Sequence, residues 1–171
     1  MNLQRLAILS FFALLFSMFG LCKAQENYPT PPKNKFQLFY IQHNSNHNTF
    51  VYEIDVNNEK SPVKVYRINY ESKGEINELS PIQRKYAYGV NYLNDRKTTF
   101  SLAAMKNIPF ELKSSNQKYF TEILINNKKI IVERIFIHND KSSSGLKTKV
   151  DYIMVYGKNA SGKSVAEKFV P

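Results

Sequence analysis

Apolar and polar residues alternate over several short stretches of this chain, and this pattern restricts its fold more than any other feature. In residues 49–56, for example, Phe50, Tyr52 and Ile54 share one face, and the residues between them share the other. Successive side chains of a β-strand point to opposite faces, so period-two alternation predicts a strand with one buried face. We therefore expect a mainly β chain.

Clusters of Asn, Gly, Lys and Ser separate the alternating stretches, and residues of these types favour turns. The predicted strands are residues 36–42, 49–56, 63–70, 98–105, 119–126, 129–137, 150–156 and a last short one at 164–170. Consecutive strands joined by short loops pair antiparallel. The pattern thus predicts a single antiparallel β domain over residues 36–171, either a sandwich or a barrel.

Two local motifs refine this prediction. Asn126 and Asn127 lie between two predicted strands, and Asn tolerates the left-handed backbone that a tight hairpin turn requires. One stretch departs from the alternation: Ser80 suits a helix N-cap, Pro81 suits the first helical position, and Gly89 suits the end. We expect one short helix near residues 80–88.

The N-terminal residues predict export. Residues 1–24 contain one Arg at position 5, an apolar run and small residues before Gln25, which is typical of a secretory signal peptide cleaved after Ala24. Lipid anchoring through Cys22 is an alternative, although Leu21 is larger than the residue that normally precedes a lipidated Cys, and a retained membrane anchor is another. Residues 25–35 carry three prolines and are expected to form an extended tether.

Composition limits the chemistry that remains. The predicted mature chain has no Cys, which excludes a disulfide, a thiolate nucleophile and a Cys-based zinc site. Removal of residues 1–24 takes away Arg5 and Lys23 but no acidic residue, so the formal net charge falls from +10 to +8. A basic exported protein is expected to meet an envelope protein or an anionic glycan rather than nucleic acid. A surface charge that serves solubility alone is the alternative, and no cofactor is expected.

Residues 157–164 match the expression of a phosphate-binding P-loop, GKNASGKS, and follow a predicted strand. A working P-loop leads into a helix, whose N-terminus and backbone amides hold the phosphates within a parallel sheet. Only seven residues follow Ser164, and no alternation of strands and helices precedes it. We therefore predict a hairpin turn at Gly157–Ser164 and no nucleotide partner.

His43 and His47 flank an Asn-rich connection, and with Glu53 they are the candidate metal ligands of a metal-assisted hydrolase. A secure site needs three or four ligands, and His138 is the remaining His. A polar turn whose Asn side chains bond the backbone is the alternative. Other hydrolytic sets, namely Ser80 with His138 and Asp151, or a pair of carboxylates, have no motif to support them. The possible carboxylates are Glu53, Glu78, Glu122 and Glu133.

Aromatic and basic residues are most concentrated around the predicted helix. Arg84, Tyr86 and Tyr88 are the candidate ligand-binding residues, because such mixtures recognise ligands through stacking and cation–π contacts. The alternative is structural, with Arg84 paired to a carboxylate such as Glu78 or Glu133.

Several segments resemble a bacterial family catalogued as domain of unknown function 4833. The resemblance rests on FYIQHNSNHNTFVYEIDVN, PVKVYRINYES, ELSPIQRKYAYG, RIFIHND and VDYIMVYGKNASGKSVAEK, which start at residues 39, 62, 78, 134 and 150. It covers nearly all of the predicted mature chain, and its most specific block is residues 82–89. The resemblance implies one exported domain and a turn at residues 157–164, and it implies no catalytic residues.

The function expected from the sequence is an exported, non-catalytic binding or interaction module of the bacterial cell envelope. Its location would be the periplasm or the extracellular space. A small-ligand carrier β-barrel and the metal-assisted hydrolase are the alternatives. A cavity lined by aromatic residues would favour the carrier, and convergence of His43, His47 and Glu53 would favour the hydrolase.

Overall fold

The computed structural model describes residues 28–143 and 148–171. The predicted signal peptide, its cleavage site and Cys22 lie outside these residues. No helix in the described part of the chain is both long enough and apolar enough to span a membrane.

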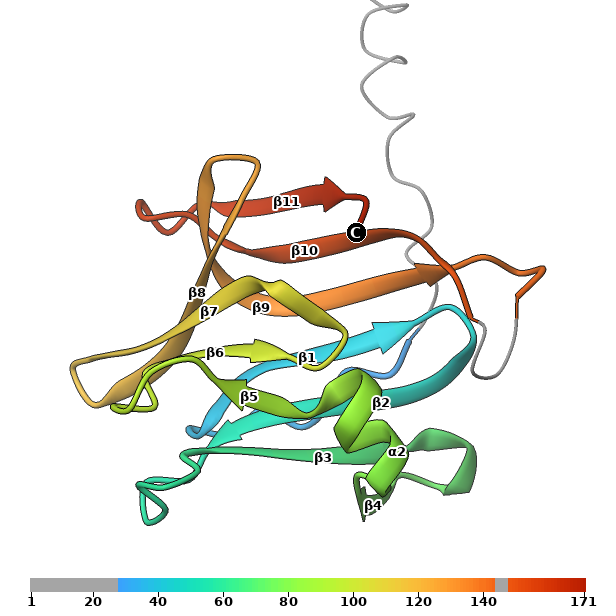
Figure 1. The fold of residues 1–171 in the computed structure, drawn as a ribbon, viewed down its shortest axis with the longest axis horizontal. Coiled ribbons are helices and arrows are strands. Elements are labelled where there is room, and N and C mark those ends of the chain that lie inside the picture. Colours follow the sequence, from blue (N-terminus) through green and yellow to red (C-terminus); the bar gives the residue numbers. More distant parts are fainter. Residues whose placement is uncertain (1–27, 144–147) are drawn as a thin grey trace, which may run out of the picture.

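The strands of the described residues belong to one sheet that curls into a half-barrel (Figure 1). The strands are β1 (Gln37–His43), β2 (Asn46–Ile54), β3 (Val63–Asn69), β4 (Glu75–Glu78), β5 (Val90–Tyr92), β6 (Thr99–Leu102), β7 (Met105–Ser115), β8 (Lys118–Ile125), β9 (Lys128–Asn139), β10 (Val150–Lys158) and β11 (Ser164–Phe169). Their order is β4-β3-β2-β1-β9-β8-β7-β6-β5, and β10 and β11 branch from β9. The predicted mainly β fold with one short helix is confirmed, and its single sheet curls into a half-barrel.

Strand β9 connects the parts of the sheet. Its first residues, 128–131, pair with β8, residues 134–137 pair with β1, and residues 131–139 pair with β10 along its other edge. The β1–β9 pair is parallel, an exception to the mainly antiparallel pairing that we predicted. A tight hairpin forces antiparallel pairing only on consecutive strands, and β1 and β9 are separated by seven other strands along the chain.

Hairpin turns set the register of several pairs. Asn126 and Asn127 have φ values of 50° and 61°, which confirms the predicted left-handed turn between β8 and β9. Asn116 and Gln117, between β7 and β8, have the same conformation, with φ values of 49° and 61°. The prediction missed β7 because residues 98–105 contain β6, a turn at Ala103 and Ala104, and the first residue of β7.

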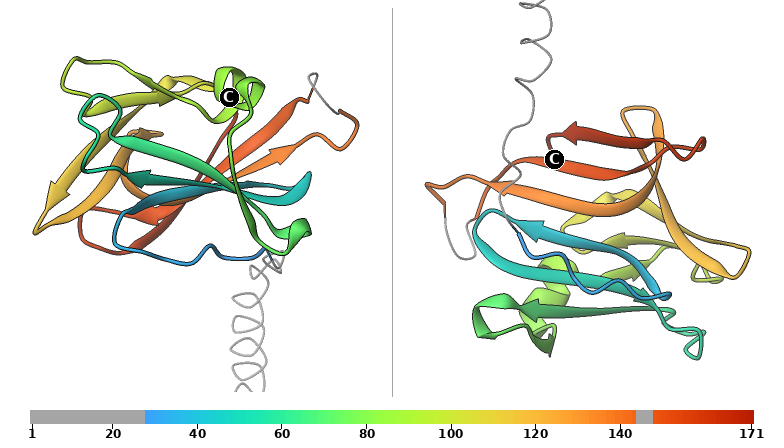
Figure 2. Two further views of the ribbon diagram at one scale, coloured as in Figure 1. Left: turned by 90° about the horizontal axis from the view of Figure 1, so that it is seen from below. Right: turned by 180° about the vertical axis from the view of Figure 1, so that it is seen from behind.

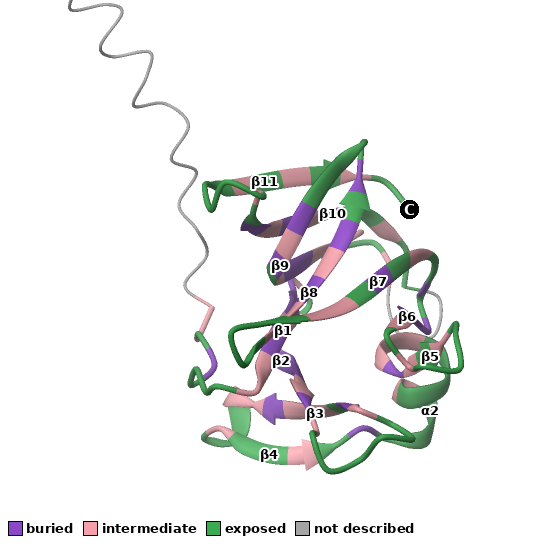
Figure 3. Cartoon of the chain, turned by 90° about the vertical axis from the view of Figure 1, so that its left-hand side faces the viewer, coloured by how far each residue is buried: buried purple, intermediate pink, exposed green. Residues whose placement is uncertain are grey.

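The core lies on the concave face of the sheet. Buried residues alternate with more exposed ones along β8 and β10, as the banded ribbons of Figure 3 show. Tyr52, Phe39, Phe110 and Phe100 form a continuous stack, with ring centroids 4.4, 5.4 and 5.4 Å apart in that order. All four rings are fully buried, so this stack joins β2, β1, β7 and β6 across the half-barrel.

The predicted short helix is present as α2 (Pro81–Gln83), which continues as a π-helical turn, η2 (Arg84–Tyr88). Ser80 is the N-cap: its side chain accepts from the Gln83 backbone, and the Gln83 side chain accepts from the Ser80 backbone. Gly89 ends the segment, where a Cβ would overlap the carbonyl oxygen of Arg84. The cap residues therefore fix both ends of the segment, as the sequence predicted.

Part of the predicted tether packs on the outer face of the sheet. The ring of Tyr28 lies 5.2 Å from His47 and 4.9 Å from Phe136, and the Gln42 side chain donates to the Pro29 carbonyl at 2.8 Å. Figure 2 (right) shows this segment, in blue, running along the strands before it enters β1. Residues 28–35 have no regular secondary structure, as predicted for a Pro-rich segment, but these contacts attach them to the domain.

Candidate functional site

A cavity of about 600 Å³ lies at the end of the half-barrel where β1 ends and β2 begins. The helical segment, the β6–β7 turn and the adjoining ends of β9 and β10 complete its wall. Its lining residues are Ile41, His43, Ser45, Asn46, Asn48, Phe50, Gln83, Ala87, Tyr88, Leu102, Ala104, Met105, Ile137, Asn139, Thr148, Val150, Ile153 and Pro171. A volume of this size is within the range of pockets that hold small molecules.

The deep wall of this cavity is apolar. Ile41, Phe50, Leu102, Met105 and Ile153 line it, and each is at most 7% exposed. They belong to five different strands, namely β1, β2, β6, β7 and β10. Every second side chain of a strand points to the same face, so each of these strands can direct a side chain toward the cavity.

The hairpin that joins β1 to β2 is tied to the end of β9. The Asn44 side chain donates to the Asn139 carbonyl at 3.0 Å and accepts from the Asn139 backbone at 2.8 Å. The Asn139 side chain donates to the Ser45 hydroxyl at 2.7 Å. These bonds confirm the polar turn whose Asn side chains bond the backbone. They also attach the β1–β2 hairpin, which lines one side of the cavity, to the end of β9.

Two buried polar atoms belong to side chains that line the cavity. Neither Nδ1 of His43 nor Oδ1 of Asn48 has a hydrogen-bond partner among the described residues. His43 is only 6% exposed, and burial lowers the pKa of its imidazole to about 4, so the ring is neutral near pH 7. Both atoms are themselves buried, so a molecule in the cavity does not contact them in this conformation. Leaving them unpaired costs free energy.

Tyr88 forms the roof of the cavity. Its ring stacks on Phe50 with centroids 3.5 Å apart, and its backbone carbonyl accepts a 2.8 Å hydrogen bond from the Tyr52 hydroxyl. Burial raises the pKa of the Tyr88 phenol well above its ordinary value, so it stays protonated in neutral solution. These contacts fix η2 against β2, the strand that supplies both Phe50 and Tyr52.

The three predicted ligand-binding residues occupy two different surroundings. Tyr88 lines the cavity, whereas Tyr86 is 62% exposed, with the Lys85 ammonium 5.1 Å from its ring. Arg84 lies 3.8 Å from the Glu78 carboxylate, and both side chains are mostly exposed. Arg84 and Tyr86 therefore present an outer surface of the same helical segment.

The three predicted metal ligands do not share one environment. His43 lines the cavity, His47 packs against Tyr28 on the outer face, and Glu53 accepts a 2.7 Å hydrogen bond from Tyr66. Within residues 28–143 and 148–171, no three His, Cys, Asp or Glu side chains are arranged to hold a metal ion.

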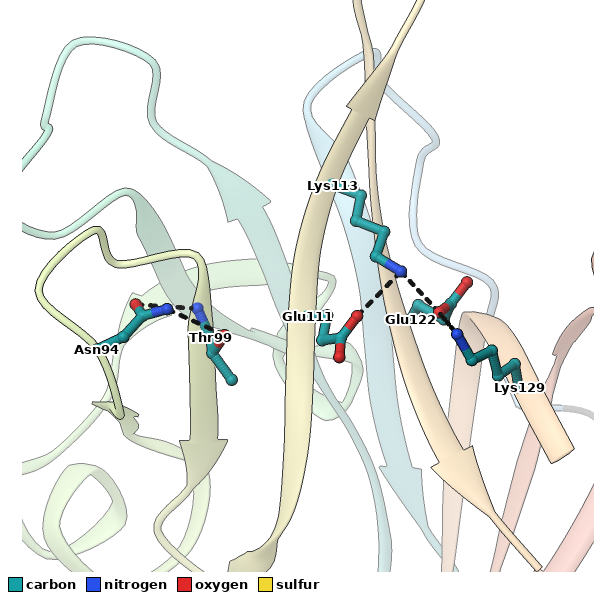
Figure 4. Close-up of polar contacts among 6 residues, drawn as sticks. All are labelled: Asn94, Thr99, Glu111, Lys113, Glu122 and Lys129. Atoms are coloured by element: carbon teal, nitrogen blue, oxygen red, sulfur yellow. Dashed lines mark hydrogen bonds and ion pairs between the residues drawn. The ribbon is translucent and has the colours of Figure 1, made fainter. Parts of the chain in front are cut away.

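The carboxylates from which a hydrolytic pair could be drawn have separate partners. Glu122 accepts from Lys113 at 2.7 Å and lies 3.6 Å from Lys129, while Lys113 also contacts Glu111 at 2.9 Å (Figure 4). The hydrogen bond from Lys113 lowers the pKa of Glu122, which keeps this carboxylate ionised. Glu133 pairs with Lys158 at 3.4 Å. Glu122 is therefore part of an ion-pair network on the sheet.

The other hydrolytic set is also divided. Ser80 is engaged as the helix cap, and His138 stacks on Tyr152 with ring centroids 4.0 Å apart on the β9–β10 pair. Ser80 therefore has a structural role, and His138 packs against an aromatic neighbour on the sheet.

The P-loop-like segment is the predicted hairpin turn. Lys158 pairs with Ser164 across antiparallel β10 and β11, and a strand rather than a helix follows. Oδ1 of Asn159 accepts from the backbones of Ser161 and Lys163, and Gly162 has a φ of 78°. Two backbone amides of the turn, those of Ser161 and Lys163, therefore donate hydrogen bonds to the side chain of Asn159 in the same turn.

Residues 39–168 match the family described as domain of unknown function (DUF4833). The chain belongs to this family. No curated protein and no solved structure matches it. The match includes all of β2, the helical segment, β9 and β10, and residues 39–43 of β1, so every lining residue of the cavity of this DUF4833 chain except Pro171 lies inside the family domain.

Two of the main lining residues of the cavity of this DUF4833 chain, Asn48 and Phe50, were not predicted as site residues from the sequence. Both lie on the inward face of β2, because Asn48, Phe50 and Tyr52 are two residues apart. The signal that identifies Asn48 is a polar residue at an inward position of an alternating strand. The Asn-rich context of this residue favoured a turn instead.

Proposed function

We propose that this chain is an exported, non-catalytic binding protein of the bacterial cell envelope that holds a small molecule in the cavity beneath η2. The single observation that carries the proposal is the cavity itself, which has an apolar deep wall and a few polar lining residues, among them His43, Asn48 and Asn139. Apolar pockets with a few convergent polar groups are the usual form of small-molecule sites.

This proposal joins two expectations from the sequence. The binding module was expected to use Arg84, Tyr86 and Tyr88, and Tyr88 is a lining residue of the cavity. The carrier alternative was expected to have an aromatic-lined cavity, and Phe50 and Tyr88 supply two aromatic rings. Export rests on the character of residues 1–24, and the envelope location rests on the family resemblance.

The metal-assisted hydrolase has weaker support. Its three ligands would have to converge, whereas His43, His47 and Glu53 contact different neighbours. A hydrolase that works without metal needs a nucleophile beside a base, and Ser80 is bonded to Gln83.

Native mass spectrometry of the protein purified from its own source tests the proposal. We expect the wild-type protein to retain the mass of a small molecule. Ala87→Leu adds apolar atoms at the cavity wall and is expected to lose that mass. Ala166→Leu, the same change on the exposed side of β11, is the matched control and is expected to retain it. A bare mass for all three proteins would count against the proposal.

A further inference from the structure

An extended proline-containing segment lies on the outer face of the sheet. Residues 28–31, which we call the strap, read Tyr-Pro-Thr-Pro, and Pro31 is buried although the segment has no regular secondary structure. Because proline fixes its own φ, a segment of this composition is largely preorganised in an extended conformation. Less conformational entropy is therefore lost when such a segment docks on a protein surface.

The aromatic ring of the strap contacts two side chains of the sheet. The Tyr28 ring meets Phe136 of β9 edge-on, with ring centroids 4.9 Å apart, and its centroid lies 5.2 Å from that of His47 on β2. Edge-to-face contacts stabilise aromatic pairs beyond the area that they bury. These two neighbours therefore hold the strap at its first described residue.

A buried amide on β1 binds the backbone of the strap. Nε2 of Gln42 donates one hydrogen bond to the Thr49 hydroxyl at 2.9 Å and another to the Pro29 carbonyl at 2.8 Å, and Gln42 is only 1% exposed. A side-chain amide nitrogen carries two hydrogens, so the bond to Thr49 fixes the side chain while the second hydrogen bonds the strap. We call Gln42, His47 and Phe136 the strap site.

The contacts of the strap are separate from the backbone ladder of the sheet. Among the described residues, no backbone hydrogen bond joins residues 28–33 to a strand. Pro32 and Lys33, which lead from the strap toward β1, are exposed. The strap can therefore leave its site while the sheet stays intact. Exchange of an identical element between two copies keeps the same contacts and is a low-cost route to a dimer.

We propose that the strap site binds the strap of a second copy of this chain, so that two copies exchange residues 28–31 and form a dimer. A second copy is the occupant that the contacts favour, because it presents the same tyrosine ring and proline carbonyl that the site already holds. Within one copy, the strap is held beside its site at a roughly millimolar effective concentration, so exchange requires copies at a similar local concentration. The strap lies on the outer face and the cavity on the inner face, so this inference is independent of the proposed function.

Two complementary variants of the mature chain test the exchange. Tyr28→Ala with Pro31→Ala, the strap variant, removes the recognised side chains and leaves the site open. Gln42→Met with His47→Ala, the site variant, weakens the site and releases an intact strap. The isotope-labelled strap variant is mixed with the unlabelled site variant at roughly millimolar concentration. We expect the Gln42 side-chain amide resonance of the labelled protein to shift and the mixture to sediment as a heterodimer, whereas each variant alone sediments as a monomer.

A site variant that also carries Tyr28→Ala is the matched control, and it is expected to cause no shift because its strap lacks the ring. The amide spectrum of each variant reports whether it is folded. His47→Ala alone changes an exposed residue and serves as the milder site variant if the double substitution does not fold.

The free peptide YPTPPK, which has the sequence of residues 28–33, tests recognition without a second protein. We expect it to bind the strap variant about tenfold more tightly than the wild-type protein, whose own strap competes for the site. The peptide APTPPK lacks the aromatic ring and is expected to bind the strap variant about tenfold more weakly than YPTPPK does.

A shift of the Gln42 amide with both the peptide and the site variant supports the exchange. Binding of the peptide without any effect of a folded site variant would overturn the proposal, because the site would then recognise the segment without exchange between copies. Equal binding of YPTPPK and APTPPK, or no binding of either peptide to a folded strap variant, would overturn the recognition itself. None of these outcomes changes the test of the cavity by native mass spectrometry.

Discussion

The Tyr52 hydroxyl donates a 2.8 Å hydrogen bond to the backbone carbonyl of Tyr88, and this bond attaches the helical segment to the core. Tyr52 is fully buried and belongs to the aromatic stack, whereas Tyr88 lines the cavity. The carbonyl is near the end of η2, where the backbone oxygens have no partner within the helix. One phenol group thus joins the packing of the core to the roof of the proposed binding site.

Tyr52→Phe is expected to lower the free energy of unfolding by about 1–2 kcal/mol, because the Tyr88 carbonyl loses its donor while the ring stack stays in place. Urea denaturation measures this change. Tyr86→Phe removes the same group from an exposed side chain and is expected to have almost no effect. Equal stability of both variants would show that the hydroxyl of Tyr52 does not hold the roof.

His43 makes the stability of the fold depend on pH. Burial lowers the folded-state pKa of its imidazole from 6.5 to about 4, so between these pH values the unfolded chain binds a proton that the folded chain excludes. The stability contribution of neutral His43 is therefore fully present above pH 6.5 and declines as the pH falls toward 4. The full loss is about 3 kcal/mol.

Thermal unfolding at a series of pH values measures this dependence. His43→Gln has no imidazole and is expected to show a flatter profile between pH 6.5 and 4. His47→Gln changes the exposed His of the same hairpin but keeps His43, and it is expected to retain the slope that the burial of His43 causes. A wild-type slope that persists in His43→Gln would contradict the assignment.

Arg84 is expected to contribute little to stability. Its guanidinium lies 3.8 Å from Glu78, and the two side chains are 61% and 92% exposed, so the solvent screens the pair. Arg84→Ala should change the free energy of unfolding by less than about 0.5 kcal/mol, as measured by urea denaturation. A folded Arg84→Ala protein then allows a clean test of ligand or partner binding at the outer surface of η2. A collapse of the fold would instead make Arg84 structural.

Local sequence features predicted the local structure well. Ser80, Pro81 and Gly89 marked both ends of the helical segment, and Asn126 and Asn127 marked a tight turn, because caps and turns depend on residues that are close in the chain. Strand β3, predicted at residues 63–70 and observed at Val63–Asn69, was also predicted close to its observed bounds.

Features that depend on distant residues could not be predicted in the same way. The parallel contact of Ile41 with Ile135 joins two strands with no local connection, and the curl of the sheet follows from such pairings. The cavity also depends on contacts between distant residues, since Asn48, Tyr88 and Ile153 come from separate elements. Alternation predicted that Phe50 and Tyr52 share one face of β2, but not that a cavity remains beside Phe50.

The last prediction concerns Gly157, the first residue of the P-loop-like segment. A Cβ at this position would overlap the backbone carbonyl oxygen of Ile131 on β9, so this glycine is required by close strand packing. Gly157→Ala is expected to cost about 2–3 kcal/mol, because two paired strands must separate. Gly162→Ala meets open space but a φ of 78°, and it is expected to cost about 1 kcal/mol. Urea denaturation of both variants gives the order, and a larger loss for Gly162→Ala would contradict the packing explanation.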